Sequence, residues 1–176
     1  MKVAVLGLGN VLLQDEGIGV RVVQELRHRY APPAGAEFVD GGTSAMDLLE
    51  YMAGRDLVIL VDAVKAGRGP SSVVRFAGDD IAALFRQRIS PHQLGIAEVL
   101  ATLLILGEAP KSVVLLGIEP KSMSVGLGLS PELSRVVDSV VAQVVTELRA
   151  VGVDPSPRSV SVRKPASESS PGADSA

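Results

Sequence analysis

The chain contains no cysteine and no tryptophan, and aromatic residues make up only 3% of its 176 positions. Without cysteine it can build neither a disulfide framework nor a thiolate metal site, and it has no thiol nucleophile. Its apolar runs, such as residues 57–64 and 99–106, are much shorter than the roughly 20 residues that span a bilayer. These absences argue against disulfide-stapled, thiol-dependent and membrane-spanning proteins.

The chain also has no large excess of charge of either sign. It contains 17 Lys and Arg against 20 Asp and Glu, which gives a net charge of -3. That balance offers no basic surface for a nucleic-acid backbone or an anionic membrane. Residues 1–10 contain a single basic side chain and are followed by no small-residue cleavage site. We therefore expect the N-terminus to belong to the fold and the protein to be cytoplasmic.

Length and composition predict one globular domain followed by a tail. Hydrophobic residues make up 47% and charged residues 21% of the chain, which is close to the average for soluble proteins. Residues 1–151 are long enough for a single buried core. Residues 152–176 are rich in Ser and Pro, and they contain few large apolar side chains beyond Val160 and Val162. This composition predicts a disordered tail over 152–176.

Apolar runs alternate with amphipathic segments along the first 151 residues. Nearly continuous apolar stretches are typical of strands buried on both faces, whereas apolar residues three or four positions apart are typical of helices. The expected strands cover residues 2–7, 37–40, 56–61, 72–76 and 113–118, and the expected helices cover about 17–30, 45–53, 93–106 and 131–151. This alternation predicts an α/β three-layer sandwich with a mainly parallel twisted sheet and helices on both faces.

Three polar positions stand at element boundaries. Asp15 and Glu16 precede the first helix, Asp62 ends the third strand, and His92 opens a later helix. Taken singly, each has a structural explanation as a helix cap or a turn residue. Because ligand crevices in open α/β sheets lie at the carboxyl ends of the strands, Glu16, Asp62 and His92 can converge on one rim. Two carboxylates and an imidazole would form a divalent metal site with positions left open for an outside ligand.

Other site signatures are incomplete. Gly7 and Gly9 follow the first strand, but Leu12 stands where the dinucleotide-binding fingerprint requires a third glycine, so tight turns explain these glycines without a ligand. Residues 42–46 lack the final glycine of a nucleophile elbow, and no His-Glu-x-x-His motif occurs. The second histidine, His28, lies between two arginines on the polar side of the first helix, where we expect it to be solvated.

Several short motifs, in order and over about residues 1–151, resemble those of one enzyme family. They are Gly-Leu-Gly-Asn at 7–10, Asp-Glu-Gly-Ile-Gly-Val at 15–20, Asp-Gly-Gly-Thr at 40–43, Val-Asp-Ala at 61–63, Ser-Pro-His-Gln-Leu-Gly at 90–95, Gly-Ile-Glu-Pro at 117–120 and Leu-Ser-Pro at 129–131. This combination resembles the nickel-iron hydrogenase maturation endopeptidases. It is far more specific than any single glycine pair.

The resemblance implies an endopeptidase that removes the C-terminal extension from the precursor of the hydrogenase large subunit after nickel insertion. It also implies that Glu16, Asp62 and His92 bind the metal, with the nickel supplied by the precursor. Asp40 matches another acidic position near the cleft and is the candidate catalytic residue. A water activated by the metal and a water activated by a carboxylate such as Asp40 are both open alternatives.

Two other classes of function stay open at this point. A non-catalytic accessory protein would bind the hydrogenase precursor without needing the metal-binding residues. A nucleotide-binding regulator would need an intact phosphate loop, and Leu12 weakens that interpretation.

Overall fold

A five-stranded sheet forms the centre of the molecule in the computed structural model, which describes residues 1–87 and 91–158, without the side chains of residues 85–92. The strand order is β3-β1-β4-β6-β5. The strands are β1 (Val3–Leu8), β3 (Ala36–Gly42), β4 (Leu57–Ala63), β5 (Val73–Ala77) and β6 (Val113–Ile118). Four of them run parallel, and β5 pairs antiparallel with β6 at one edge. The predicted α/β fold with a mainly parallel sheet is confirmed.

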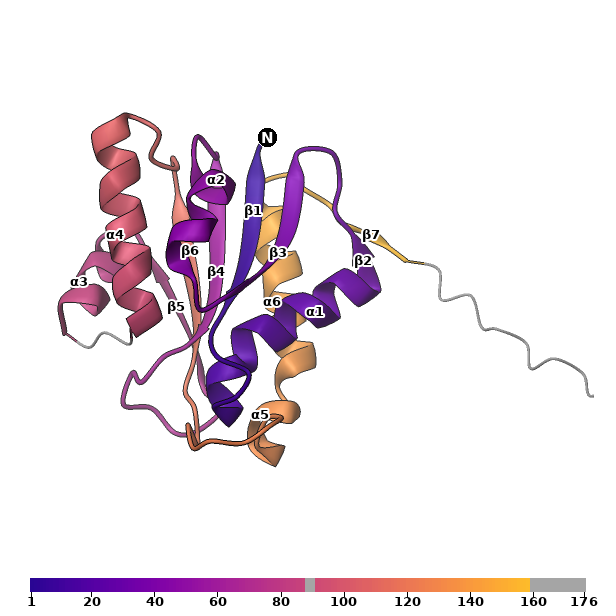
Figure 1. The fold of residues 1–176 in the computed structure, drawn as a ribbon. Helices are drawn as coiled ribbons and strands as arrows, with labels where there is room; N and C mark the ends of the chain where they lie inside the picture. Colours follow the sequence, from indigo (N-terminus) through magenta and orange to yellow (C-terminus); the bar gives the residue numbers. More distant parts are fainter. Residues whose placement is uncertain (88–90, 159–176) are drawn as a thin grey trace, which may run out of the picture.

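Helices cover both faces of this sheet (Figure 1). On one face lie α1 (Ile18–Arg29) and α6 (Val137–Ala150), whose apolar side chains share one core cluster with the sheet. The other face carries the 3-10 helix η2 (Ala45–Leu48), α2 (Leu49–Met52), α3 (Asp79–Gln87) and α4 (Pro91–Leu106). The smaller elements are the 3-10 helix η1 (Gln14–Gly17), α5 (Pro131–Ser134), β2 (Tyr30–Ala31) and β7 (Ser156–Pro157).

The central strands β1 and β4 are buried along their whole length. Because helices lie on both sides of them, these strands have no solvent-facing positions and show no alternation of polar and apolar residues. This explains why the continuous apolar runs in the sequence identify them correctly. The same arrangement makes Asp62 unusual, since it is a carboxylate within a strand in which every residue is buried.

Two local features of the helices differ from the expectation. Helix α3, which begins with Asp79 and Asp80, was not predicted between the strand at 72–76 and the helix at 93–106. The single helix expected over 131–151 is two helices, separated by a turn at residues 135–136. Ser130 caps the first of these, because its side chain accepts a hydrogen bond from the Leu133 amide.

The folded domain extends past the predicted boundary at residue 151. Val153 is 8% exposed, and Ser156 and Pro157 form β7, which pairs antiparallel with β2. The Arg158 amide donates a hydrogen bond to the Arg29 carbonyl at 2.7 Å. The prediction of a disordered tail is therefore wrong for residues 152–158. After α6 the backbone of these residues pairs with the backbone of residues 29–31, at the end of α1 and in β2. The rest of the predicted tail, 159–176, lies outside the described residues.

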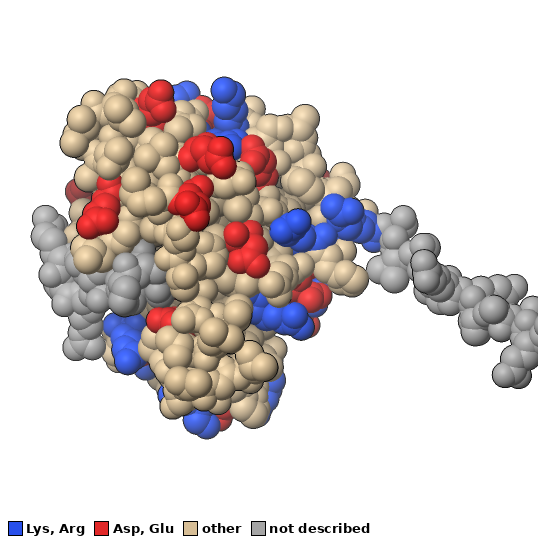
Figure 2. Space-filling model, in the orientation of Figure 1, with Lys and Arg blue, Asp and Glu red and all other residues tan. Residues whose placement is uncertain are grey.

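Helix α4 has apolar residues on almost all sides. Ile96, Val99 and Leu103 are buried in the core on this face of the sheet, whereas Leu104 and Ile105 are 72% and 86% exposed. Even so, within residues 1–87 and 91–158 no helix is long and apolar enough to cross a bilayer. Figure 2 shows acidic side chains gathered over the upper half of the visible face, and most of the basic side chains to the right and below.

The β2–β7 pairing leads to a test by truncation. A chain that ends at Arg158 keeps every contact described for residues 152–158, whereas a chain that ends at Val153 loses β7 and its backbone hydrogen bonds. We expect only the shorter chain to lose stability, by about 1–3 kcal/mol for a few hydrogen bonds and some buried area. Thermal unfolding of both truncated chains and the full chain measures this. Equal melting temperatures for the two truncated chains would contradict it.

Candidate functional site

The first helix approaches the carboxyl ends of β1 and β4 unusually closely. A Cβ atom added to Gly19 in α1 would lie 2.0 Å from the Val61 carbonyl oxygen, and one added to Gly7 would lie 2.2 Å from the Gly19 carbonyl oxygen. Gly9 has a φ of 120°, and a Cβ there would lie 1.7 Å from the Glu16 carbonyl oxygen. The glycines at 7, 9 and 19 therefore permit a backbone contact that any side chain would block.

This contact brings η1, with Glu16, to the end of β4. Glu16 is 7% exposed, and η1 packs against β4. Asp62, the penultimate residue of β4, is completely buried. Asp62 and η1, which carries Glu16, therefore both lie near the carboxyl-terminal end of β4, the region where ligands bind in open α/β sheets.

The Asp62 carboxylate is held by the first turn of α4. The side-chain amide of Gln93 donates a hydrogen bond to Asp62 Oδ2 at 2.9 Å and another to the Ala63 carbonyl oxygen at 3.2 Å. Gln93 is itself 5% exposed, so both bonds are shielded from water and fix the position of the carboxylate firmly. Gln93 belongs to the motif at 90–95, but no role was predicted for it. Its position in the first turn of a predicted helix, next to His92, was the feature of the sequence that could have identified it.

His92 stands directly before Gln93 in α4, so the Gln93–Asp62 bond brings its backbone to the end of β4. Its side chain lies outside the described residues. Among those that are described, no group of three or more His, Cys, Asp and Glu side chains could hold a metal ion. The three-ligand site of Glu16, Asp62 and His92 stays a prediction. The other histidine, His28, is exposed on α1 as expected.

Asp15 has a structural role that differs from the predicted helix cap. Helix α1 has Gly17 at its N-cap position and no side-chain cap. The completely buried Asp15 carboxylate instead accepts hydrogen bonds from the backbone amides of Lys121, Ser122 and Ser130, at 2.6–3.0 Å. It thereby fastens residues 121–130 to η1. A cap was expected because capping needs only local sequence, whereas these partners lie more than 100 residues away.

Glu119 anchors a second loop at this edge. This buried carboxylate follows β6 and accepts hydrogen bonds from the backbone amides of Ala66 and Arg68, at 2.8 and 3.0 Å. The loop after β4 is therefore tied to the end of β6. Glu119 directly follows the buried strand β6, so its place at a strand end was the signal in the sequence that could have identified it.

Asp40 is exposed near the end of β3 and points to a different side of the sheet from Asp62. Its carboxylate accepts hydrogen bonds from the Gln24 side chain of α1 and from the Gly42 amide, both at 3.2 Å. Asp40 pairs with Gly7, and Gly7 pairs with Val61, so two strand spacings, about 10 Å, separate its backbone from β4. Successive side chains alternate between the two faces, which puts Asp40 on the α1 face and Asp62 on the α4 face.

Comparisons with known proteins agree on one family. The sequence model of the family HycI, described as hydrogenase maturation protease, matches residues 20–147. The chain is 43% identical to the hydrogenase 2 maturation protease of Escherichia coli (strain K12) over 159 residues, which cover 90% of this chain and 97% of that protein.

Two solved structures show the same fold. The hydrogenase maturating endopeptidase HybD from E. coli has a TM-score of 0.86 and 44% identity, covering 90% of this chain and 99% of its own. The NiFe hydrogenase maturation protease HybD from Thermococcus kodakarensis has a TM-score of 0.69 and 27% identity, covering 84% and 99%.

The role of Asp15 can be tested by a single-atom change. Replacing Asp15→Asn puts an amide donor among three backbone amides that also donate, and it removes a charge that strengthens their bonds. We expect the variant to lose about 2–4 kcal/mol of unfolding free energy, measured by denaturant titration. Asp47→Asn, at an exposed position in η2, is the matched control and should change stability little. Equal stability of the two variants would contradict the anchoring role.

Proposed function

Because the chain belongs to the hydrogenase maturation protease family, we propose that it removes the C-terminal extension from the precursor of a nickel-iron hydrogenase large subunit after nickel insertion. The observation that supports this most strongly is the fully buried Asp62 carboxylate, held by Gln93 at the edge where Glu16 also lies. Burying a carboxylate in an otherwise apolar strand costs stability, and such costly buried groups cluster at functional sites.

The nickel in this proposal arrives as part of the precursor. Glu16 and Asp62 would offer carboxylate oxygens and His92 an imidazole nitrogen, a donor set that suits a divalent ion such as nickel. Three side chains leave coordination positions that the precursor fills with its own ligands. Recognition would then depend on joint coordination, which positions the scissile peptide bond beside the two carboxylates.

Hydrolysis also requires a group that accepts a proton from the attacking water. The oxygen of that water bonds to the peptide carbonyl carbon, the carbon–nitrogen bond breaks, and the proton passes to the leaving amine. Activation of the water by nickel is one alternative, and Asp40 acting as a general base is the other. Asp40 is exposed and bonded to Gln24, so substrate can reach it, although its carboxylate lies on the other face from Asp62.

A non-catalytic accessory protein would bind the same precursor without cutting it. Incubation with the nickel-loaded precursor, followed by intact mass measurement, separates the two functions. Loss of the mass of the C-terminal extension supports a protease. An unchanged mass with stable binding supports the accessory protein.

We further propose that the reaction takes place in the cytoplasm.

The two histidines give a matched pair of variants. We expect His92→Ala to abolish precursor cleavage with little loss of thermal stability, because a ligand at the sheet edge contributes more to metal binding than to the core. His28→Ala, at an exposed position on α1, should cleave at the normal rate. Cleavage rates and melting temperatures of both variants provide the measurement. If both variants cleave alike, His92 is not the site histidine.

Removal of nickel tests the origin of the metal. The proposed site has no thiolate and only one imidazole, so it should hold metal weakly without ligands from the substrate. We expect the purified protein to contain less than one tightly bound metal ion, and nickel-free precursor to stay uncut while loaded precursor is processed. Elemental analysis and mass measurement check both. Efficient cutting of nickel-free precursor by chelator-treated enzyme would indicate a metal-independent carboxylate mechanism instead.

A further inference from the structure

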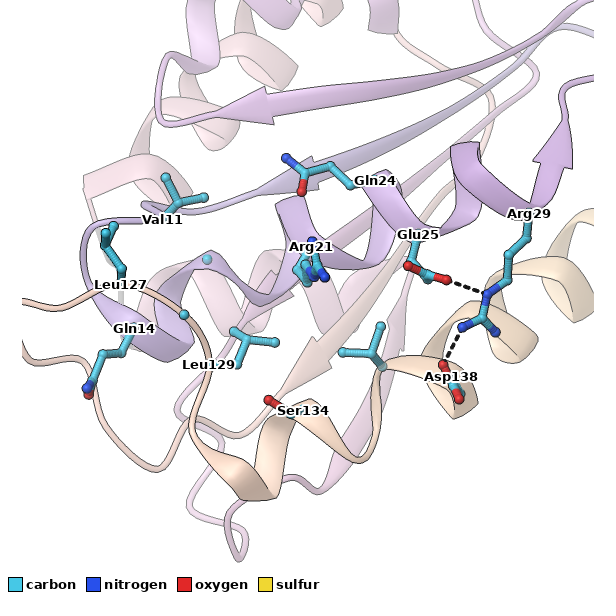
Figure 3. Close-up of a pocket in the computed structure, with 13 residues that line it drawn as sticks. Val11, Gln14, Arg21, Gln24, Glu25, Arg29, Leu127, Leu129, Ser134 and Asp138 are labelled. Atoms are coloured by element: carbon cyan, nitrogen blue, oxygen red, sulfur yellow. Dashed lines mark hydrogen bonds and ion pairs between the residues drawn. The ribbon is translucent and has the colours of Figure 1, made fainter. Parts of the chain in front are cut away.

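A groove of about 700 Å³ runs along α1 away from the candidate site (Figure 3). It lies between α1 and residues 127–138, and its volume is within the range of about 300–1,000 Å³ that is usual for ligand sites. One end is formed by Val11, Gly17 and Leu127, and Gly17 directly follows Glu16. The other end is formed by Arg29 and Asp138. The groove therefore begins at the residue after Glu16, and Gln24 in its lining donates a hydrogen bond to Asp40.

The charges at the far end of the groove are already paired. Arg29 forms ion pairs with Glu25 and with Asp138, both at 2.6 Å. The hydrogen bonds that Arg29 donates to these two carboxylates raise the pKa of Arg29 above its ordinary value, so it stays charged. This end needs no ligand to balance its charges.

Arg21 lies in the middle of the groove and is exposed. Figure 3 shows it between the Val11–Leu127 end and the Arg29–Asp138 end. Lys121, Arg55 and Arg75 each pair with a carboxylate elsewhere on the molecule, whereas no ion pair or hydrogen bond of the Arg21 guanidinium is found among the described residues. A guanidinium left open in a groove can bind a carboxylate through two parallel hydrogen bonds.

The end nearest the site is apolar and firmly held. Val11 is 48% exposed and Leu127 is 82% exposed. Their loops are joined by a hydrogen bond of 2.9 Å from the Gly126 amide to the Leu12 carbonyl oxygen. Large apolar side chains presented to solvent on a fixed loop pair are suited to packing against an apolar side chain of a partner.

We propose that this groove binds the segment of the precursor next to the scissile bond, with Arg21 pairing with a carboxylate of that segment. The inference rests on the proposed function and adds a specificity residue to it. Arg21 is the fourth residue of α1 and follows Glu16 of η1 by five residues, so an acidic group of the precursor close to the scissile bond is the group that Arg21 would bind.

Binding of the nickel-loaded precursor to the full-length protein tests the inference directly. We expect Arg21→Glu to weaken binding by roughly ten- to a hundredfold, the usual range for a lost charged hydrogen bond. Arg21→Lys should lose less, because it keeps the charge but not the paired geometry. The control is Arg27→Glu, an exposed arginine of α1 that does not line this groove, and it should bind as the unmodified protein does.

Two further binding experiments identify the precursor carboxylate that pairs with Arg21. Synthetic peptides covering the precursor's C-terminal segment, with a free or an amidated C-terminus, test the terminal carboxylate. Precursors in which one acidic side chain is replaced by Lys test the side chains, and the correct replacement should restore binding to Arg21→Glu.

The outcomes separate this inference from the proposed function. If Arg21→Glu binds and cuts the precursor as the unmodified protein does, the inference is overturned and the protease function stands. If the unmodified protein binds but does not cut, the protease function fails. A selective loss of binding in Arg21→Glu would then still support the groove.

Discussion

The contact between the start of α1 and the carboxyl ends of β1 and β4 determines where η1 and its residue Glu16 lie relative to Asp62. It exists only because Gly7, Gly9 and Gly19 have no side chains, since a Cβ at each would lie 1.7–2.2 Å from a carbonyl oxygen. No side-chain rearrangement could relieve such overlaps, because the atoms concerned belong to the backbone. With these glycines in place, η1 lies against β4, and Glu16 lies near the carboxyl-terminal end of the strand that carries Asp62.

The buried carboxylates at this edge differ in what they accept hydrogen bonds from. Asp15 and Glu119 accept from backbone amides of the loops that they anchor, so their charge is used to order the chain. Asp62 accepts from the side chain of Gln93, and this bond orients a carboxylate without ordering a loop. At Asp62 the carboxylate therefore ties the end of β4 to α4.

The sequence predicts the parts of this structure that depend on local pattern. The strands near 56–61 and 113–118 are recognisable because burial on both faces requires continuous apolar runs. Asp62 is found by its place at a strand end. The hydrogen bonds of Asp15 cannot be found in this way, because they join residues 106–115 positions apart. The pairing of β7 with β2 is hidden for the same reason, since a Ser- and Pro-rich segment pairs only where a distant strand offers free backbone groups.

Helix α1 joins the candidate site to the groove and is fixed at both ends. Its first turn is held by the glycine contacts, and its last residue, Arg29, is bonded to Asp138 of α6 and, through its carbonyl, to the Arg158 amide. Because the helix cannot slide on the sheet, the separation between Glu16 and Arg21 is constant. A substrate that must satisfy both positions is selected by the spacing of its own groups, and none of the binding energy is used to order the helix. Specificity of this kind follows from the rigid packing of η1 and α1, which carry Glu16 and Arg21.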